Sequence, residues 1–250
     1  DDRDENGNLI IASDYTDEYS ICKLAQPQLS LFNQNEVNNE VTESLVKFEA
    51  VEGATSYKVS VSPSIGDESE FEITNNFILI DSSYAVGIEY TITVTPVGDI
   101  AHTILGQSNS IKFTRIGTVD GASISDNTLT FNAITDASSY AIIVKSDEDT
   151  KYTISTSPYL DLSEKIDVVG TYRIYIKALG VISEVINRAN GDLYDTQLTF
   201  TKLDKVNAST VSNSGVITWQ AVTDATSYNV FVDDNFLANT NECTYTFPIG

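Results

Sequence analysis

The chain has 250 residues, enough for two or three domains of ordinary size. Its 36 Asp and Glu residues far outnumber its 14 Lys and Arg residues, so its formal net charge is −22 at pH 7. Because phosphate and anionic lipid both require clustered positive charge, this balance argues against a nucleic-acid partner and against an anionic membrane surface. No stretch approaches the ~20 apolar residues of a membrane helix, so we expect no membrane insertion.

An acidic turn lies near the start of the chain. The segment from Asp2 to Gly7, DRDENG, matches the opening of a calcium-binding loop, in which oxygens at alternate positions converge on the ion and glycine permits a sharp turn. The acid that should close such a loop would fall at Ser13, whereas the nearest acid is Asp14. The pair Asn6-Gly7 is also a strong signal for a two-residue hairpin. We therefore favour an acidic hairpin over a calcium site, and we expect no metal-binding residues and no cofactor.

One pattern of two alternating runs recurs three times along the chain. The copies run from Val46 to Val61, from Leu129 to Val144 and from Ile217 to Val232. Each copy contains an aromatic residue that is followed nine positions later by a tyrosine. These pairs are Phe48 and Tyr57, Phe131 and Tyr140, and Trp219 and Tyr228. Repetition of this kind indicates a tandem array of one structural unit.

Each copy predicts two neighbouring strands that share an apolar face. Val46 and Phe48 alternate with polar residues, as do Tyr57 and Val59, and successive side chains of a strand point to opposite faces. Turn residues such as Gly53 separate the two runs. Since two apolar faces must cover each other, the pattern predicts a sandwich of two sheets.

Two later runs complete the pattern in the first two copies. Gly87 to Val94 matches Gly170 to Ile176, and the closing run Ile111 to Ile116 matches Leu198 to Leu203. The third copy has no counterpart of either run. One segment departs from the strand pattern, because the apolar spacing from Val181 to Ile186 predicts a short helix.

These runs divide the chain into four parts. Tyr19 to Leu24 aligns with the closing runs, so we expect residues 1–24 to be the closing hairpin and strand of a preceding repeat. Residues 25–116 and residues 117–203 are expected to be whole repeats. Residues 204–250 are expected to be the N-terminal part of a further repeat.

The aromatic of the second strand, the tyrosine of the third and the Gly-x-x-Tyr before the sixth resemble fibronectin type III domains. The wording Ala-Thr-Ser-Tyr at residues 54–57 resembles copies found in bacterial surface and secreted proteins. The resemblance implies an all-β fold of tandem immunoglobulin-like sandwiches in an extended array, in an extracellular or cell-surface location. It also implies a tyrosine corner, expected at Tyr90 rather than at Tyr172, because Gly170 lies one residue closer to its tyrosine than Gly87 does.

Residues that could catalyse a reaction are scarce. His102 is the single histidine, and no motif supplies it with a nucleophile to activate. Cys22 and Cys243 lie on expected strands, where a small buried apolar residue is the ordinary interpretation. We therefore expect a protein that is not an enzyme, with no catalytic and no cofactor-binding residues.

The leading functional hypothesis is a non-catalytic extracellular spacer or scaffold region of a modular surface or secreted protein. One alternative is an adhesin or carbohydrate-binding module, with a protein or glycan ligand on the cell surface; candidate aromatics are Tyr194 on a loop, Tyr152 and Tyr159. Another alternative is a filament subunit in which residues 1–24 complete the third repeat of the next molecule. We expect the isolated segment to be a monomer.

Overall fold

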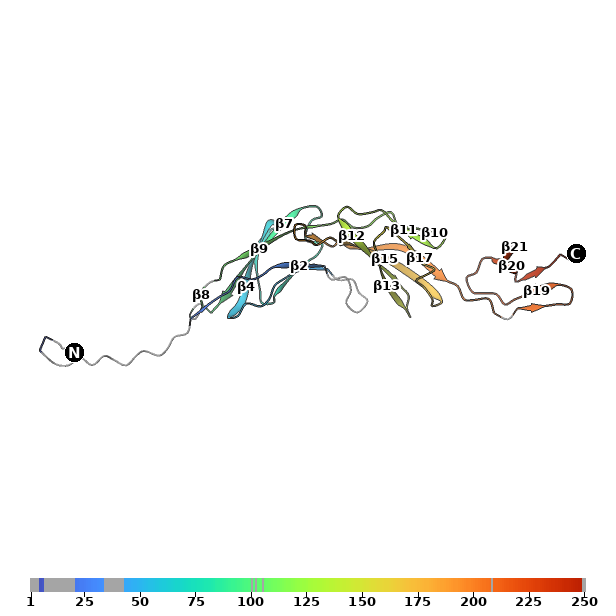
Figure 1. Ribbon diagram of the computed structural model, residues 1–250, viewed down its shortest axis with the longest axis horizontal. Helices are drawn as coiled ribbons and strands as arrows, with labels where there is room; N and C mark the ends of the chain where they lie inside the picture. Colours follow the sequence, from blue (N-terminus) through green and yellow to red (C-terminus); the bar gives the residue numbers. More distant parts are fainter. Residues whose placement is uncertain are drawn as a thin grey trace. The chain divides into compact units, whose positions relative to one another are not determined.

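The computed structural model describes residues 5–6, 21–33, 43–99, 101, 103–104, 106–207 and 209–248. Every regular element in these ranges is a β-strand (Figure 1), and the strands form stacked sheets, so the prediction of all-β sandwiches is confirmed. The chain divides into two compact units. The described residues of the first unit fall within Asp1–Phe32, Ser44–Thr114 and Glu184–Asn187. Those of the second unit fall within Asn33–Glu43, Arg115–Ser183 and Arg188–Gly250.

The first sandwich packs a three-stranded sheet against a larger sheet. The smaller sheet has the order β2 (Ser30–Asn33), β3 (Ser44–Lys47) and β6 (Phe77–Ile80). In the larger sheet the neighbouring strands are β9 (Asn109–Arg115), β7 (Glu89–Gly98), β4 (Ala54–Ile65) and β5 (Glu68–Ile73). A short strand, β1 (Cys22–Lys23), runs parallel to β8 (Thr103–Ile104).

Alternation along these strands builds the core of the first sandwich. On β7 the buried side chains of Tyr90, Ile92 and Val94 alternate with partly exposed ones. Val94 lies opposite Val59 of β4 in the antiparallel register. Phe48, which follows β3, is 4 % exposed, as the repeat pattern predicted.

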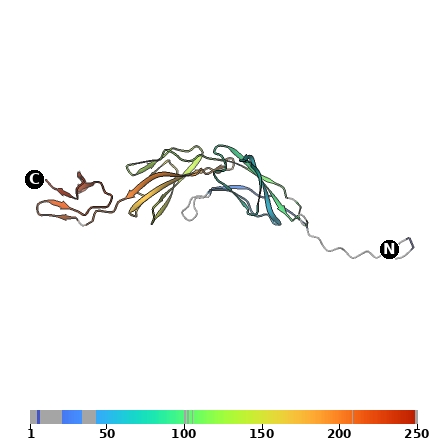
Figure 2. The ribbon, with the colours of Figure 1, turned by 180° about the vertical axis from the view of Figure 1, so that it is seen from behind.

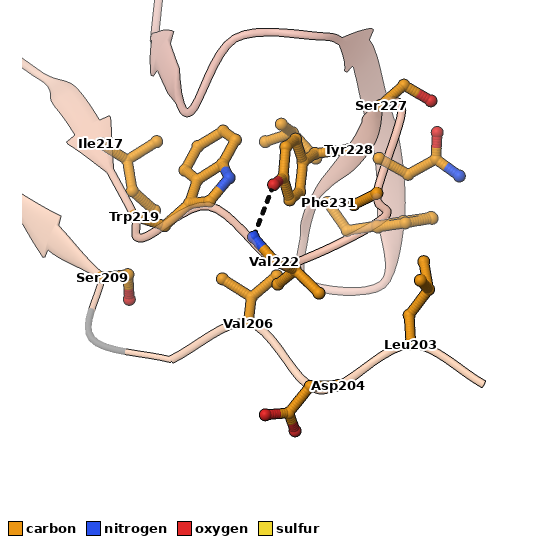
Figure 3. Close-up of a pocket in the computed structure, with 13 residues that line it drawn as sticks. Leu203, Asp204, Val206, Ser209, Ile217, Trp219, Val222, Ser227, Tyr228 and Phe231 are labelled. Carbon is orange, nitrogen blue, oxygen red and sulfur yellow. Dashed lines mark hydrogen bonds between the residues drawn. The ribbon is translucent and has the colours of Figure 1, made fainter. Parts of the chain in front are cut away.

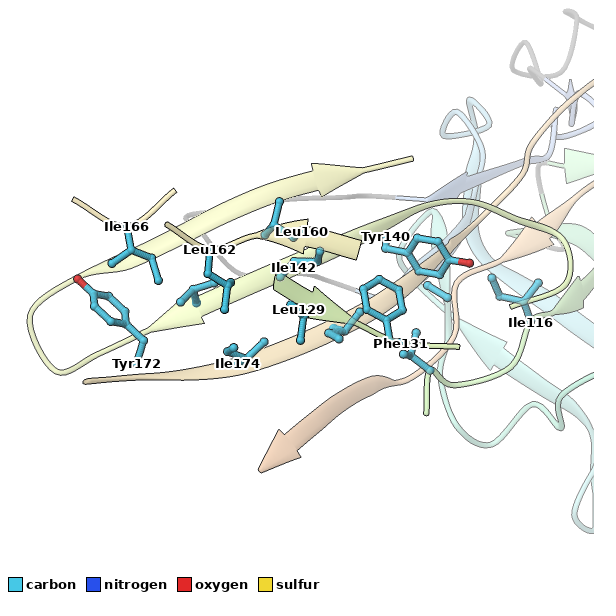
Figure 4. Close-up of a cluster of buried hydrophobic side chains, with 14 residues drawn as sticks. Ile116, Leu129, Phe131, Tyr140, Ile142, Leu160, Leu162, Ile166, Tyr172 and Ile174 are labelled. Carbon is cyan, nitrogen blue, oxygen red and sulfur yellow. The ribbon is translucent and has the colours of Figure 1, made fainter. Parts of the chain in front are cut away.

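The second sandwich repeats this plan (Figure 2). Its smaller sheet has the order β10 (Ser123–Ser125), β11 (Thr128–Thr130) and β14 (Tyr159–Asp161). Its larger sheet has the order β13 (Thr150–Ser155), β12 (Ala137–Lys145), β15 (Gly170–Gly180) and β17 (Leu193–Lys202). Figure 4 shows the core between the sheets, where Phe131 and Tyr140 lie side by side and β15 contributes Tyr172 and Ile174.

The predicted helix from Val181 to Ile186 is wrong. A six-residue segment is too short to offset the cost of starting a helix. The amide of Arg188 instead donates a hydrogen bond to the carbonyl of Val181 at 2.8 Å, which turns the chain back into β16 (Arg188–Ala189).

The third copy of the pattern folds as two small sheets. One has the order β18 (Thr210–Val211), β19 (Val216–Thr218) and β22 (Thr244–Thr246). The other is the hairpin of β20 (Tyr228–Val232) and β21 (Asn235–Thr240). These are the counterparts of the first five strands of the second sandwich, β10 to β14.

Cys22, Lys23 and Leu24, at the end of the first expected part of the chain, pair with a strand of the first sandwich. Cys22 and Lys23 pair with β8 of the first sandwich, and the amide of Leu24 donates to the carbonyl of Ile104 at 3.1 Å. Leu24 is 2 % exposed, so it is buried in the first sandwich. Cys22–Leu24 therefore lie against the first sandwich, because the edge of β8 offers them backbone partners.

Candidate functional site

A hydrogen-bonded turn recurs in all three copies of the repeat. The phenol oxygen of each repeat tyrosine accepts a hydrogen bond from a backbone amide six residues earlier. The pairs and distances are Tyr57 with Val51 at 2.8 Å, Tyr140 with Ile134 at 2.9 Å, and Tyr228 with Val222 at 2.9 Å. This bond holds the turn that precedes each third strand.

The same turn fixes the backbone and the aromatic pair. One residue of this turn has a positive φ in every copy: the angle is 80° at Gly53 and 64° at both Asp136 and Asp224. Glycine adopts a positive φ without strain, and aspartate tolerates it better than most residues. The two rings of each copy meet edge to face, with centroids 4.7 Å apart at Phe48–Tyr57, 4.9 Å at Phe131–Tyr140 and 5.4 Å at Trp219–Tyr228. The third copy is therefore folded locally like the other two.

The apolar face of the third copy differs in being open. Trp219 and Tyr228 are half-buried, whereas Phe131 and Tyr140 are only 7 % and 5 % exposed. The open face is a groove of about 480 Å³ (Figure 3). Its walls include Leu203, Val206, Ile217, Trp219, Tyr228 and Val230. We call these residues the Trp219 groove.

Two polar features belong to the Trp219 groove. The indole nitrogen of Trp219 is buried and has no hydrogen-bond partner among the described residues. One edge of β20 is also open: β12 pairs with both β13 and β15, whereas among the described strands β20 pairs only with β21. The groove thus combines an apolar floor with backbone groups able to extend a sheet.

The cysteines are more exposed than the sequence suggested. Cys22 is exposed and Cys243 is half-buried, so the expectation of two buried residues is wrong. Cys22 lies on a two-residue strand at the edge of its sandwich, where little chain covers it. The thiol of Cys243 lies 3.8 Å from the phenol oxygen of Tyr228, beside the open groove.

Two other candidates lie outside the described residues. They are His102 and, apart from Glu5 and Asn6, the acidic turn from Asp2 to Gly7. Among the residues that the structure describes, no group of three His, Cys, Asp or Glu side chains could hold a metal ion. Within the same ranges, no helix is long and apolar enough to cross a membrane.

Both candidate tyrosine-corner residues bond to the backbone upstream. Tyr90 accepts from the amide of Ala85 at 3.0 Å, and Tyr172 donates to the carbonyl of Val168 at 3.0 Å. The expected preference for Tyr90 is therefore not seen, because the shorter glycine spacing still leaves the Val168 carbonyl within reach. Burial raises the pKa of the Tyr172 phenol, and the nearby carboxylate of Asp149 raises it further.

The three tyrosines proposed for ligand binding lie on different strands and differ in their exposure. Tyr194 lies within β17 rather than on a loop and packs against the core of the second sandwich. Tyr152 on β13 lies opposite Ile143 in the sheet register and is half-buried. Tyr159 is 57 % exposed at the start of β14.

Comparison with known proteins finds likeness only at the level of structure. No family model matches the chain, and no curated protein matches it. Similar solved structures include the FN1–FN3 domains of chicken CNTN1, at 13 % identity and a TM-score of 0.37, covering 73 % of this chain and 68 % of that one. A two-domain fibronectin type III segment of chicken tenascin has 16 % identity and a TM-score of 0.29, covering 70 % of this chain and 99 % of that one.

The strand order of each sheet defines the fold. Each whole sandwich packs a three-stranded sheet against a larger sheet whose neighbouring strands are the third, fourth, sixth and seventh of the repeat. Each whole sandwich has the fibronectin type III arrangement. The fibronectin type III fold hosts many unrelated roles, so function must be argued from the surfaces and joints of this chain.

Proposed function

We propose that this chain is a non-catalytic spacer or scaffold region of a modular surface or secreted protein. The repeats would act by holding other domains apart, so the property that matters is the stiffness of the joints. We propose an extracellular or cell-surface location, a bacterial source and a monomeric state for the isolated chain. We also propose repeats at residues 25–116 and 117–203, with Cys22–Leu24 added to the first, and the start of a further repeat at residues 204–250.

One observation carries the spacer proposal. The segment that follows β9 is built into the core of the second sandwich, where Ile116 and Val119 are 4 % and 1 % exposed. The amide of Ile116 also donates to the carbonyl of Ala189 at 3.1 Å. Little free chain therefore remains between Arg115, the last residue of β9, and Ser123, the first residue of β10. A short, packed connection suits a spacer because it limits bending.

Distance distributions between two spin labels test this proposal. Labels would be placed at the exposed positions Asp67 and Glu164 by Asp67→Cys and Glu164→Cys, in a chain carrying Cys22→Ser and Cys243→Ser. We expect a narrow distribution from double electron–electron resonance. Inserting Gly-Gly-Ser-Gly-Gly-Ser after Gly117 should broaden it, and provides the matched control. An equally broad distribution without the insertion would contradict a stiff spacer.

A further inference from the structure

A pocket on the outward face of the second sandwich brings two cations together beside an aromatic ring. Its volume is about 350 Å³, within the range of roughly 300–1,000 Å³ that is usual for small-molecule sites. Along β15, Arg173 alternates with the buried core residues Tyr172 and Ile174, so its side chain points away from the core. The pocket is lined by Lys145, Ser146, Asp147, Thr171, Arg173 and Tyr175. We call it the Lys145–Arg173 pocket.

The two cations of this pocket oppose each other across the sheet. Arg173 on β15 is the register partner of Lys145 on β12, and both side chains are exposed. Their other register partners are neutral, Thr150 for Lys145 and Thr199 for Arg173. Like charges placed directly opposite each other destabilise an antiparallel pair. The arrangement therefore concentrates positive charge at one point of a chain whose net charge is −22.

Both cations retain the capacity to bind an anion. Among the described residues, no carboxylate lies within ion-pair distance of the Lys145 ammonium. Nη2 of Arg173 lies 3.6 Å from Oδ2 of Asp195 and 3.5 Å from Oε1 of Gln197, and these contacts use one of the three guanidinium nitrogens. A guanidinium has five N–H donors in a fixed fork, which matches the two oxygens of a carboxylate. One carboxylate can thus neutralise the opposed pair.

The rest of the lining narrows the class of ligand. The half-buried ring of Tyr175 offers an apolar face, and the exposed carboxylate of Asp147 can only accept hydrogen bonds. A complementary ligand therefore has a carboxylate, an apolar ring face and hydroxyl donors, which are the groups of a sugar acid. Two cations are too few for a nucleic acid or an anionic membrane, and the net charge of −22 repels polyanions.

The first sandwich has the same sheet without this pocket chemistry. Counted from the repeat tyrosines, Ser62 and Thr91 stand at the positions of Lys145 and Arg173, and they too are register partners. Thr93 stands at the position of Tyr175. The fold therefore does not require two cations and an aromatic ring on this face.

We propose that the Lys145–Arg173 pocket binds a single carboxylated sugar unit, of the uronic acid class. The sugar carboxylate lies between the Lys145 ammonium and the Arg173 guanidinium, where charge-assisted hydrogen bonds hold it. The C–H face of the ring packs on Tyr175, and ring hydroxyls donate to Asp147. This binding role is separate from the proposed spacer role, because it depends on one face of one sandwich and on no joint.

Titrations followed by amide NMR spectra of the whole chain test the proposal with three probes. Methyl β-D-glucuronide carries both the ring and the carboxylate, methyl β-D-glucoside carries the ring without the carboxylate, and acetate carries the carboxylate without the ring. We expect the glucuronide to shift the amide signals of Lys145, Arg173 and Tyr175 in a saturable way. The glucoside and acetate should bind more weakly than the glucuronide.

The first sandwich also supplies the variants. Lys145→Ser and Arg173→Thr introduce the residues that the same fold carries at Ser62 and Thr91, so we expect the amide spectrum to remain that of a folded chain. Each should weaken glucuronide binding about two- to fivefold, as for the loss of one exposed ion pair, and the double variant should lose the saturable shifts. Lys165→Ser, at an exposed lysine of the same sandwich outside the pocket, is the matched control and should bind like the parent chain.

Four results would overturn the proposal. No saturable shift with the glucuronide would show that the pocket does not bind a sugar acid. Equal binding of the glucoside would show that the carboxylate is not recognised, and equal binding of acetate would show that the ring is not. Unchanged glucuronide binding by the folded double variant would place the binding elsewhere on the chain.

Discussion

The phenol oxygens of Tyr57, Tyr140 and Tyr228 have the same hydrogen-bond partner in all three repeats. Each accepts the amide that begins the turn before its own strand. The sequence spacing predicted that these tyrosines pack beside an aromatic residue. It could not predict the role of the hydroxyl, because the acceptor geometry depends on a turn whose positive φ can be supplied by either Gly or Asp.

The first prediction concerns this hydroxyl. Tyr140→Phe keeps the ring in the core but leaves the amide of Ile134 without its acceptor, so we expect a loss of about 1–3 kcal/mol in unfolding free energy. Urea unfolding of the whole chain measures it. Tyr159→Phe removes a hydroxyl from an exposed ring and should change stability little. Equal effects of the two substitutions would contradict the role assigned to Tyr140.

The aromatic anchors give the second prediction. Phe131 is 7 % exposed inside the second core, so Phe131→Ala should leave a cavity and cost about 3–5 kcal/mol of unfolding free energy. Thermal or urea denaturation gives the value for that sandwich. A loss below about 1 kcal/mol would mean that the side chain is not a core residue.

Buried phenols give the third prediction, on pH. Burial raises the pKa of Tyr84 well above its usual range, with Asp81 and Tyr90 adding to the shift, and burial raises the pKa of Tyr172 as well. The folded state then holds these protons more tightly than the unfolded state, so stability is full below about pH 10 and falls as the pH rises further. Urea midpoints from pH 8 to pH 11 should decline, and Tyr172→Phe should lessen the decline of the second sandwich. Urea midpoints that stay constant from pH 8 to pH 11 would contradict this prediction.

At the scale of the elements, the strands were predictable because their apolar faces alternate with period two. Strand β7 and strand β15 were found this way. The short strand β1 was not assigned to the first sandwich, because a two-residue strand has no period and its partner β8 is as short. The Trp219 groove was also missed, since exposure of a core position depends on which strands cover it.

The fourth prediction compares equivalent positions on two connecting segments. Ile116 is 4 % exposed in the second core, whereas its counterpart Leu203 is 42 % exposed at the Trp219 groove. Ile116→Ala should therefore cost about 2–5 kcal/mol, while Leu203→Ala should cost less than about 1 kcal/mol. Urea unfolding of both variants measures the difference. Similar losses would mean that the two segments are packed alike.

At the scale of the whole molecule, the acid excess and the joints act together. A net charge of −22 disfavours contact between like surfaces of neighbouring repeats and between molecules. In the segment after β9, Ile116 and Val119 are core residues of the second sandwich, a depth of burial that the sequence alone could not indicate. We propose an extended monomer, in keeping with the acid excess and with the proposed spacer role.

Small-angle X-ray scattering of the 250-residue chain tests this central claim most directly. A compact globule of this length would have a radius of gyration of about 18 Å. We predict a clearly larger radius, the same at every protein concentration, with the scattering of folded sandwiches rather than of an unfolded chain. A concentration-independent value near about 18 Å would contradict an extended spacer.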